Sequence, residues 1–180
     1  MGISVFPEPS AASKTMRRTV LTSGTTFTVP ATVTFVNVTL FGGGGGGGGC
    51  GLASPGSSAG GAGGTTTFTG ATSATGGNGG ERSFADTGGN TTVHCVAVGT
   101  EGKTNTGQEG LGGSCNSATR GYQKAGNGTA GQVISSTLTT TPGGTINYAI
   151  GGGGSGGAES NSAGTGGAGG SGFIIVEYWI

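Results

Sequence analysis

Residues 32–49 read TVTFVNVTLFGGGGGGGG, an alternating run followed directly by eight consecutive glycines. Val36, Val38 and Leu40 alternate with polar residues, a pattern that predicts a half-buried β-strand. Val33 and Phe35 fall in the opposite phase, so we expect a bend or bulge near Phe35. Later glycine clusters repeat a Gly-Gly-X triplet at 59–64, 75–80 and 165–172, with X always Ala, Ser, Thr or Asn. A polyproline-II helix has three residues per turn and no internal hydrogen bonds, so this period places each residue class on one face of a rod.

These glycines are interpreted as packed rods rather than as slack tethers. Glycine makes up 47 of 180 residues, a bias that usually indicates low complexity when it has no period. Here the triplets stay in phase, strands flank the clusters, and only 8% of the residues are charged, which is low for a disordered chain. We expect the uninterrupted run in the middle of a bundle and the triplets at its rim. The structural glycines are Gly42, Gly45, Gly49, Gly60, Gly63, Gly76, Gly79, Gly151, Gly166 and Gly169.

The predicted fold class is all-β, with little or no α-helix. Further strands are expected at 25–29, 93–98, 133–139, 146–150 and 173–180, with a turn at 142–144. They form a small β-sandwich whose connections leave one end as a bundle of glycine-rich polyproline-II helices and return. The last strand is apolar on both faces, which predicts burial on two sides; Trp179 and Ile180 could be covered by another chain or by the monomer's own core.

Residues 1–20 differ from the rest of the chain and are expected to form an N-terminal attachment arm. They contain two prolines and three basic residues but little glycine, and a short helix from Ser10 to Arg18 is possible. Residues 21–180 then form the glycine-rich domain. The first residues lack the basic and apolar regions of a secretory signal, so we expect folding in a cytosol without general export.

Composition disfavours several classes of function. Seven basic and seven acidic residues cancel, and without a basic stripe no nucleic-acid partner is expected. No apolar run approaches the roughly 18–20 residues that span a bilayer, so membrane insertion is not expected either. The only histidine, His94, lies between apolar neighbours, and the seven carboxylates show no acid–base pairing pattern. We therefore expect no enzyme, no cofactor and no metal, and we interpret the three cysteines as small buried hydrophobic residues.

Two segments between the glycine clusters carry the varied side chains. They cover 81–92 and 100–132, and a rigid scaffold that presents such loops is the usual arrangement for recognition. Tyr and Arg are typical of binding hot spots. From loop position we predict a binding site made of Arg82, Phe84, Asp86, Lys103, Arg120, Tyr122 and Gln123. The alternative is that these loops are only solvated and have no partner.

Three stretches together resemble the glycine-rich domains of bacteriophage tail-fibre and tail-tip adhesins. They are GTTFTVPATVTFVNVTLFGGGGGGG at 24–48, TPGGTINYAIGGGG at 141–154 and GGSGFIIVEYW at 169–179. They match that family's opening strand pair, later hairpin and closing strand in order. The resemblance covers roughly residues 24–180, but the loops between match no named motif and residues 1–20 fall outside it.

The resemblance implies a non-enzymatic protein of the virion, assembled in the host cytoplasm. It would sit at a tail fibre or tail tip and bind a protein or polysaccharide receptor on the bacterial surface during adsorption. It would attach to other tail-fibre or baseplate proteins through residues 1–20, and a homotrimer is expected. One alternative is a purely structural cap or connector without receptor contact. A minor alternative is an ice-binding protein, because glycine-rich bundles can present flat faces of Thr and Ala.

Overall fold

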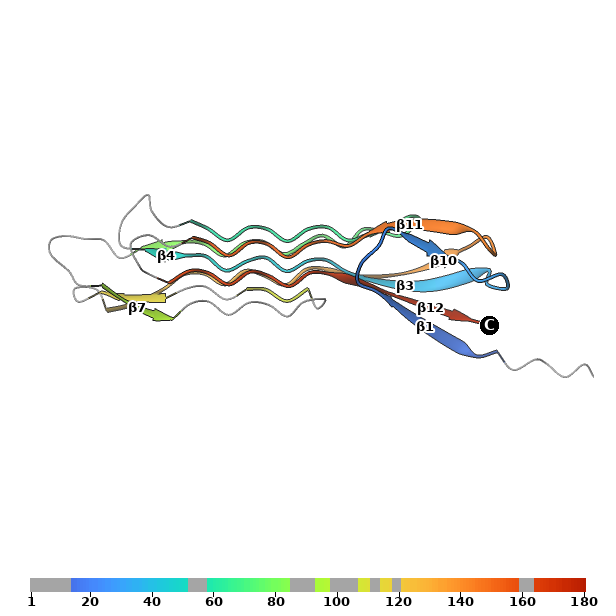
Figure 1. The fold of residues 1–180 in the computed structure, drawn as a ribbon, viewed down its shortest axis with the longest axis horizontal. Coiled ribbons are helices and arrows are strands. Elements are labelled where there is room, and N and C mark those ends of the chain that lie inside the picture. The colour runs from blue at the N-terminus through green and yellow to red at the C-terminus, as the bar shows by residue number, and fades with distance from the viewer. Residues whose placement is uncertain are drawn as a thin grey trace, which may run out of the picture.

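The chain forms a β-sandwich from which a bundle of extended rods projects toward a small β-rich tip (Figure 1). The computed structural model describes residues 14–51, 58–84, 93–97, 107–110, 114–117, 121–158 and 164–180. No helix occurs among these residues, and the predicted all-β class is confirmed. In the same part of the chain, no helix is long and apolar enough to cross a membrane.

Two antiparallel sheets make the sandwich. The larger has the strand order β1-β12-β3-β10, with bounds Met16–Leu21, Phe173–Trp179, Phe35–Phe41 and Val133–Thr139. The smaller has the order β2-β11-β5, with bounds Thr26–Thr28, Thr145–Ala149 and Thr67–Phe68. The expected change of phase is observed: Val33 is buried ahead of β3, and Val36 is buried inside it. The possible helix is wrong over residues 14–18, because β1 pairs with β12 there and so takes residues 16–20 of the expected arm into the sheet.

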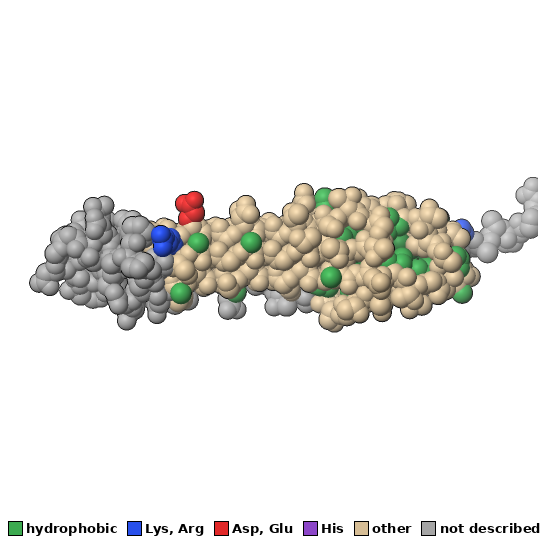
Figure 2. Space-filling model, turned by 90° about the horizontal axis from the view of Figure 1, so that it is seen from above, with side chains coloured by type: hydrophobic (Ala, Val, Ile, Leu, Met, Phe, Trp, Pro, Cys, Tyr) green, Lys and Arg blue, Asp and Glu red, His purple; other side chains and the backbone are tan. Residues whose placement is uncertain are grey.

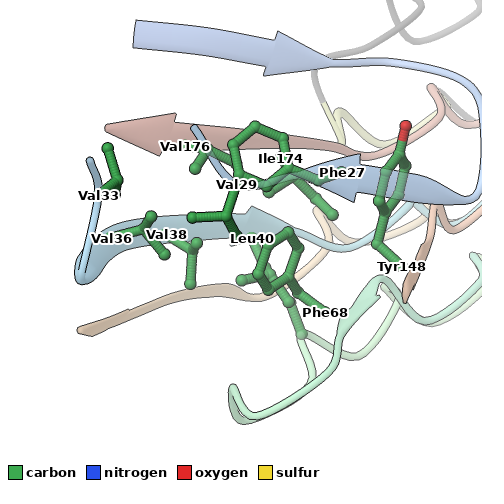
Figure 3. Packing of buried hydrophobic residues seen from close by; sticks show 11 residues of the cluster. Phe27, Val29, Val33, Val36, Val38, Leu40, Phe68, Tyr148, Ile174 and Val176 are labelled. Atoms are coloured by element: carbon green, nitrogen blue, oxygen red, sulfur yellow. The ribbon is translucent and has the colours of Figure 1, made fainter. Parts of the chain in front are cut away.

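The core of the sandwich lies between the two sheets (Figure 3). The fully buried residues of β3 and β12 are valine, isoleucine or leucine, and β-branched residues pack well against a pleated surface. Three aromatic residues, Phe27, Phe68 and Tyr148, close the core from the smaller sheet, and Tyr148 donates its hydroxyl to the Ser23 carbonyl at 2.7 Å. The buried set is Phe27, Val29, Val33, Val36, Val38, Leu40, Phe68, Ala74, Tyr148, Ile174 and Val176.

A central rod, residues 42–49, runs through the middle of the bundle and is fully buried. Each backbone N–H from Gly42 to Cys50 donates to a carbonyl of a surrounding segment at 2.8–3.0 Å. Every third donor points to the same neighbour: Gly43 and Gly46 bond to Gly64 and Gly61 of one segment. A threefold repeat of hydrogen-bond direction belongs to the polyproline-II helix. The expected position of the uninterrupted run is therefore confirmed.

Six segments surround the central rod and form a closed ring. In order around it they are 58–65, 75–82, 125–132, 107–110, 164–172 and 151–158, and each bonds to the next. Segments that accept from the central rod run antiparallel to it, and segments that donate to it run parallel. The chain therefore alternates outgoing and returning passes around the ring. Two of these segments, 107–110 and 125–132, lie within residues 100–132, which the sequence predicted to be a loop. That prediction is wrong for these two segments, because they are rods.

The third residue of each triplet lies on the outside of the ring, as the sequence predicted. Ala59, Ala62, Thr75 and Asn78 are exposed, while the glycines between them face neighbouring rods. At each of the ten glycines named as structural, an added Cβ would come closer than 3.0 Å to a backbone atom of another rod. Real Cβ atoms essentially never come that close. Glycine is therefore required here by contact between backbones.

A buried threonine joins the sandwich to the rods. Thr66 is fully buried; its hydroxyl donates to the Phe41 carbonyl at 2.7 Å and accepts from the Gly151 N–H at 3.0 Å. Phe41 directly precedes the central rod, and Phe173 directly follows segment 164–172. Their rings stack with centroids 4.0 Å apart. The rods thus leave the sandwich in directions fixed by both hydrogen bonds and packing.

Candidate functional site

The tip lies at the far end of the rods and contains five short strands (Figure 1). β4 (Cys50–Gly51) pairs in parallel with β6 (Ser83–Phe84). β7 (Val93–Ala97), β8 (Ser114–Ser117) and β9 (Gly121–Lys124) form an antiparallel sheet with an irregularity in β7 between Cys95 and Ala97. β4 lies against β8 and β6 against β9. Eight glycines at about 3.1 Å per residue hold this tip about 25 Å from the sandwich.

The tip brings together two stretches of chain that carry four of the seven predicted binding residues. Arg82 is exposed at the end of segment 75–82, directly before β6. Phe84 belongs to β6, and Tyr122 and Gln123 belong to the neighbouring strand β9. Chain segments about 40 residues apart in sequence therefore meet at one end of the molecule.

The other three predicted residues, Asp86, Lys103 and Arg120, lie outside the described residues. By sequence alone, Asp86 follows β6 by two residues and Arg120 directly precedes β9. Lys103 lies in the sequence between β7 and the rod segment 107–110. Each of them is thus part of, or next to, a connection that begins or ends at a tip strand.

Charged side chains of the described part gather at the two ends of the molecule. At the tip, Glu81, Arg82 and Lys124 are exposed, and the N–H of Gly126 donates to the Glu81 carbonyl at 2.9 Å, which joins the two segments that carry them. Along the bundle the outward positions are mostly Ala, Ser, Thr and Asn, with Glu109 as a charged exception; Figure 2 shows this largely uncharged surface from one side. Glu81 and Lys124 were not among the predicted site residues. Their positions in the sequence could have indicated them, because each lies where a rod meets a tip strand.

Cys50 is buried and disulfide-bonded. The sequence interpretation of all three cysteines as unpaired hydrophobic residues is therefore wrong for this one. The misleading signal was the odd count without a close Cys pair. Cys50 is the first residue after the glycine run, so a covalent link fastens the end of the central rod at the base of the tip.

The described residues contain no group of three or more His, Cys, Asp and Glu side chains that could hold a metal ion. A hollow of about 480 Å³ opens in the sandwich beside β10, far from the tip. It is lined mainly by threonine, with Val29, Leu138 and Ile146. It has no charged lining residue and adjoins none of the predicted binding residues.

Comparison with known proteins adds no relative: no protein-family model matches the chain, and no curated protein matches its sequence. The interpretation of the tip therefore depends on its geometry and on the motifs at 24–48, 141–154 and 169–179.

Proposed function

We propose that this chain is a receptor-binding protein of a bacteriophage tail fibre or tail tip, and that the tip contacts the bacterial surface. The observation that carries the proposal is that the two ends of the molecule differ. One end holds the sandwich and the first and last described residues, and the other end holds the short strands β4, β6, β7, β8 and β9 (Figure 1). Such a molecule attaches at one end and recognises at the other.

The structure of the rods supports a role in recognition for the tip, rather than a purely structural role. Their hydrogen bonds join backbone to backbone, so they hold the tip in place whatever side chains its loops carry. Loops on a rigid scaffold are where binding residues concentrate. Tip residues such as Arg82, Phe84 and Tyr122 belong to the types that supply binding energy at interfaces.

A cell-retention assay tests the proposal. Labelled wild-type protein is incubated with a panel of bacterial strains, and the bound fraction is measured after washing. The double variant Arg120→Ala/Tyr122→Ala should lower retention at least tenfold on any strain that the wild type binds, because a hot-spot truncation costs at least about 2 kcal/mol. The matched control is Arg17→Ala, which removes one exposed positive charge at the opposite end and should leave retention unchanged.

A purely structural connector is the second candidate, and the exposed apolar face of the larger sheet favours it. A connector would bind no strain of the panel but would bind purified virions that lack it. Equal retention of the double variant and the wild type would reject the assigned residues while leaving cell binding intact.

A further inference from the structure

All three cysteines of the chain belong to strands of the tip. Cys50 begins β4, Cys95 lies in β7 and Cys115 lies in β8. Cys50 is disulfide-bonded, so its partner within the chain is either Cys95 or Cys115. Whichever of the two it is, one thiol remains beside one disulfide.

The contacts between strands assign the disulfide to Cys115. A disulfide needs two Cα atoms roughly 4.4–6.8 Å apart, so its two cysteines must come from strands in direct contact. The tip sheet has the order β7-β8-β9, and the main contact that β4 makes with this sheet is with its middle strand, β8. Cys115 is the cysteine of that strand.

The remaining cysteine lies directly opposite Cys115 in the tip sheet. Strands β7 and β8 are antiparallel, and their register pairs Cys95 with Cys115. Directly opposite residues in such a pair have Cα atoms about 4.5 or 5.5 Å apart, and both spacings fall within the range for a disulfide. Cys115 therefore has a bonding neighbour in each of two strands.

We propose that Cys115 alternates between two disulfides, one with Cys50 and one with Cys95, by thiol–disulfide exchange. The thiolate of Cys95, formed by loss of its proton to water, attacks the sulfur of Cys115. The bond between Cys95 and Cys115 forms as the bond to Cys50 breaks, and Cys50 leaves as a thiolate that takes up a proton. One disulfide and one thiol are present before and after, so the step needs no oxidant or reductant.

The two disulfides connect different parts of the molecule. The bond from Cys50 to Cys115 fastens the end of the central rod to the tip sheet, whereas the bond from Cys95 to Cys115 joins two strands of that sheet. After exchange the Cys50 N–H still donates to the Gly164 carbonyl at 2.8 Å, so the rod keeps its backbone bond at that end. The register of β7 shifts between Cys95 and Ala97, and such an irregularity disrupts the ladder locally. Strand β7 can therefore adjust beside Cys95 when Cys115 changes partner.

The native preference for one disulfide is opposite to that of the unfolded chain. A bond between Cys50 and Cys115 closes a loop about three times as long as a bond between Cys95 and Cys115. Because the probability of closure falls as about the −3/2 power of loop length, the unfolded chain should favour the shorter loop about sixfold. A native chain that holds mainly the longer loop therefore depends on the packing of β4 against β8.

Peptide mapping tests the exchange directly. Trypsin cleavage after Arg82, Lys103 and Arg120 places the three cysteines on separate peptides. Protein purified in mild acid is held folded at about pH 8, returned to acid, unfolded, and labelled with a thiol reagent that is active in acid. The label should begin on Cys95 and spread to Cys50 with time, and the rate should be at least about a hundredfold lower at about pH 5, where the thiolate is scarce. In urea at about pH 8 the disulfides should approach the sixfold preference for Cys95–Cys115.

Three serine variants provide matched controls, each used after a cooperative melting transition shows that it is folded. Cys95→Ser should keep the bond from Cys50 to Cys115 and expose no thiol at any pH. Cys50→Ser, refolded with reduced and oxidised glutathione, should form the bond from Cys95 to Cys115. Cys115→Ser, which removes the shared cysteine, should retain two thiols under the same conditions.

Three results would each overturn the proposal: a native bond between Cys50 and Cys95, a disulfide in folded Cys115→Ser, or a label that stays on Cys95 at about pH 8. The inference does not use receptor binding. A chain that binds cells without exchanging its disulfide would therefore refute this inference alone.

Discussion

Close packing of backbones predicts that alanine at Gly45, in the central rod, is severely destabilising. The Gly45 N–H donates to the Thr129 carbonyl at 2.9 Å, and its own carbonyl accepts from Gly110 at 2.8 Å. An added Cβ would overlap the Asn78 carbonyl and approach that of Gly77. Because the obstacle is backbone rather than the end of a flexible side chain, segment 75–82 would have to move outward.

The cost follows from the bonds that such a movement breaks. Segment 75–82 donates to the central rod through Gly77 and Gly80, both at 2.8 Å, and Ser83, the residue directly after this segment, donates at 3.1 Å. A buried backbone group left unpaired costs about 1–3 kcal/mol, so losing two or three bonds costs roughly 2–9 kcal/mol. Total domain stability is about 5–15 kcal/mol. The opposing gain, from a less flexible unfolded chain, is only about 0.4–1 kcal/mol.

Gly152→Ala is the matched control. Gly152 is exposed in a neighbouring rod, and an added Cβ there meets no atom within 4 Å. The same chemical change should therefore be neutral or slightly stabilising at this site. Calorimetry should show a melting temperature lowered by at least about 2 °C for Gly45→Ala, because the net loss is at least about 1 kcal/mol and each kcal/mol is worth about 2–4 °C for a chain of this size. Equal melting temperatures for the two variants would refute close packing of the rods.

Two further predictions concern the ends of the rods. Thr66→Val should lower the free energy of unfolding by about 1–3 kcal/mol, because it leaves the Gly151 N–H without its acceptor; Thr66→Ser, which keeps the hydroxyl, should recover most of the loss in urea titrations. The native chain, unfolded without reductant, should titrate one thiol rather than three, because Cys50 is disulfide-bonded and the chain has three cysteines; three thiols per chain would contradict the disulfide.

Sequence predicted the rods because glycine packing has a strict period. A rod that is surrounded on every face needs glycine at every position. A rod with one face toward water can carry a side chain at one position in three. The segment 125–132 escaped this reasoning because it carries few consecutive glycines. Its inward positions are Ala125, Gly128 and Gly131, so small residues do recur every third position. This three-residue period was hidden because the two outward positions of each turn hold the mixed residues Gly126, Asn127, Thr129 and Ala130.

Sequence could not define the tip to the same degree. Its strands are two to five residues long, too short for alternation to specify a register. Two of the pairings, β4 with β6 and β7 with β8, also join residues far apart in the sequence. The parallel pairing of β4 with β6 joins Cys50 to Ser83, a contact that no local pattern indicates. The possible helix at 10–18 is wrong over residues 14–18 for a related reason: β1 is held by pairing with β12, and such tertiary pairing overrides weak helix propensity.

In this architecture, the contacts that hold the rods together are made by the backbone, and the outward side chains take little part in them. In the bundle, the hydrogen bonds that position the tip belong to the backbone, so they constrain residues only through size. A substitution at an outward position, such as Asn78, meets water and leaves those bonds in place, whereas a substitution at Gly45 meets a carbonyl. The outward side chains of the bundle can therefore change in chemistry while the rods keep the same backbone hydrogen bonds.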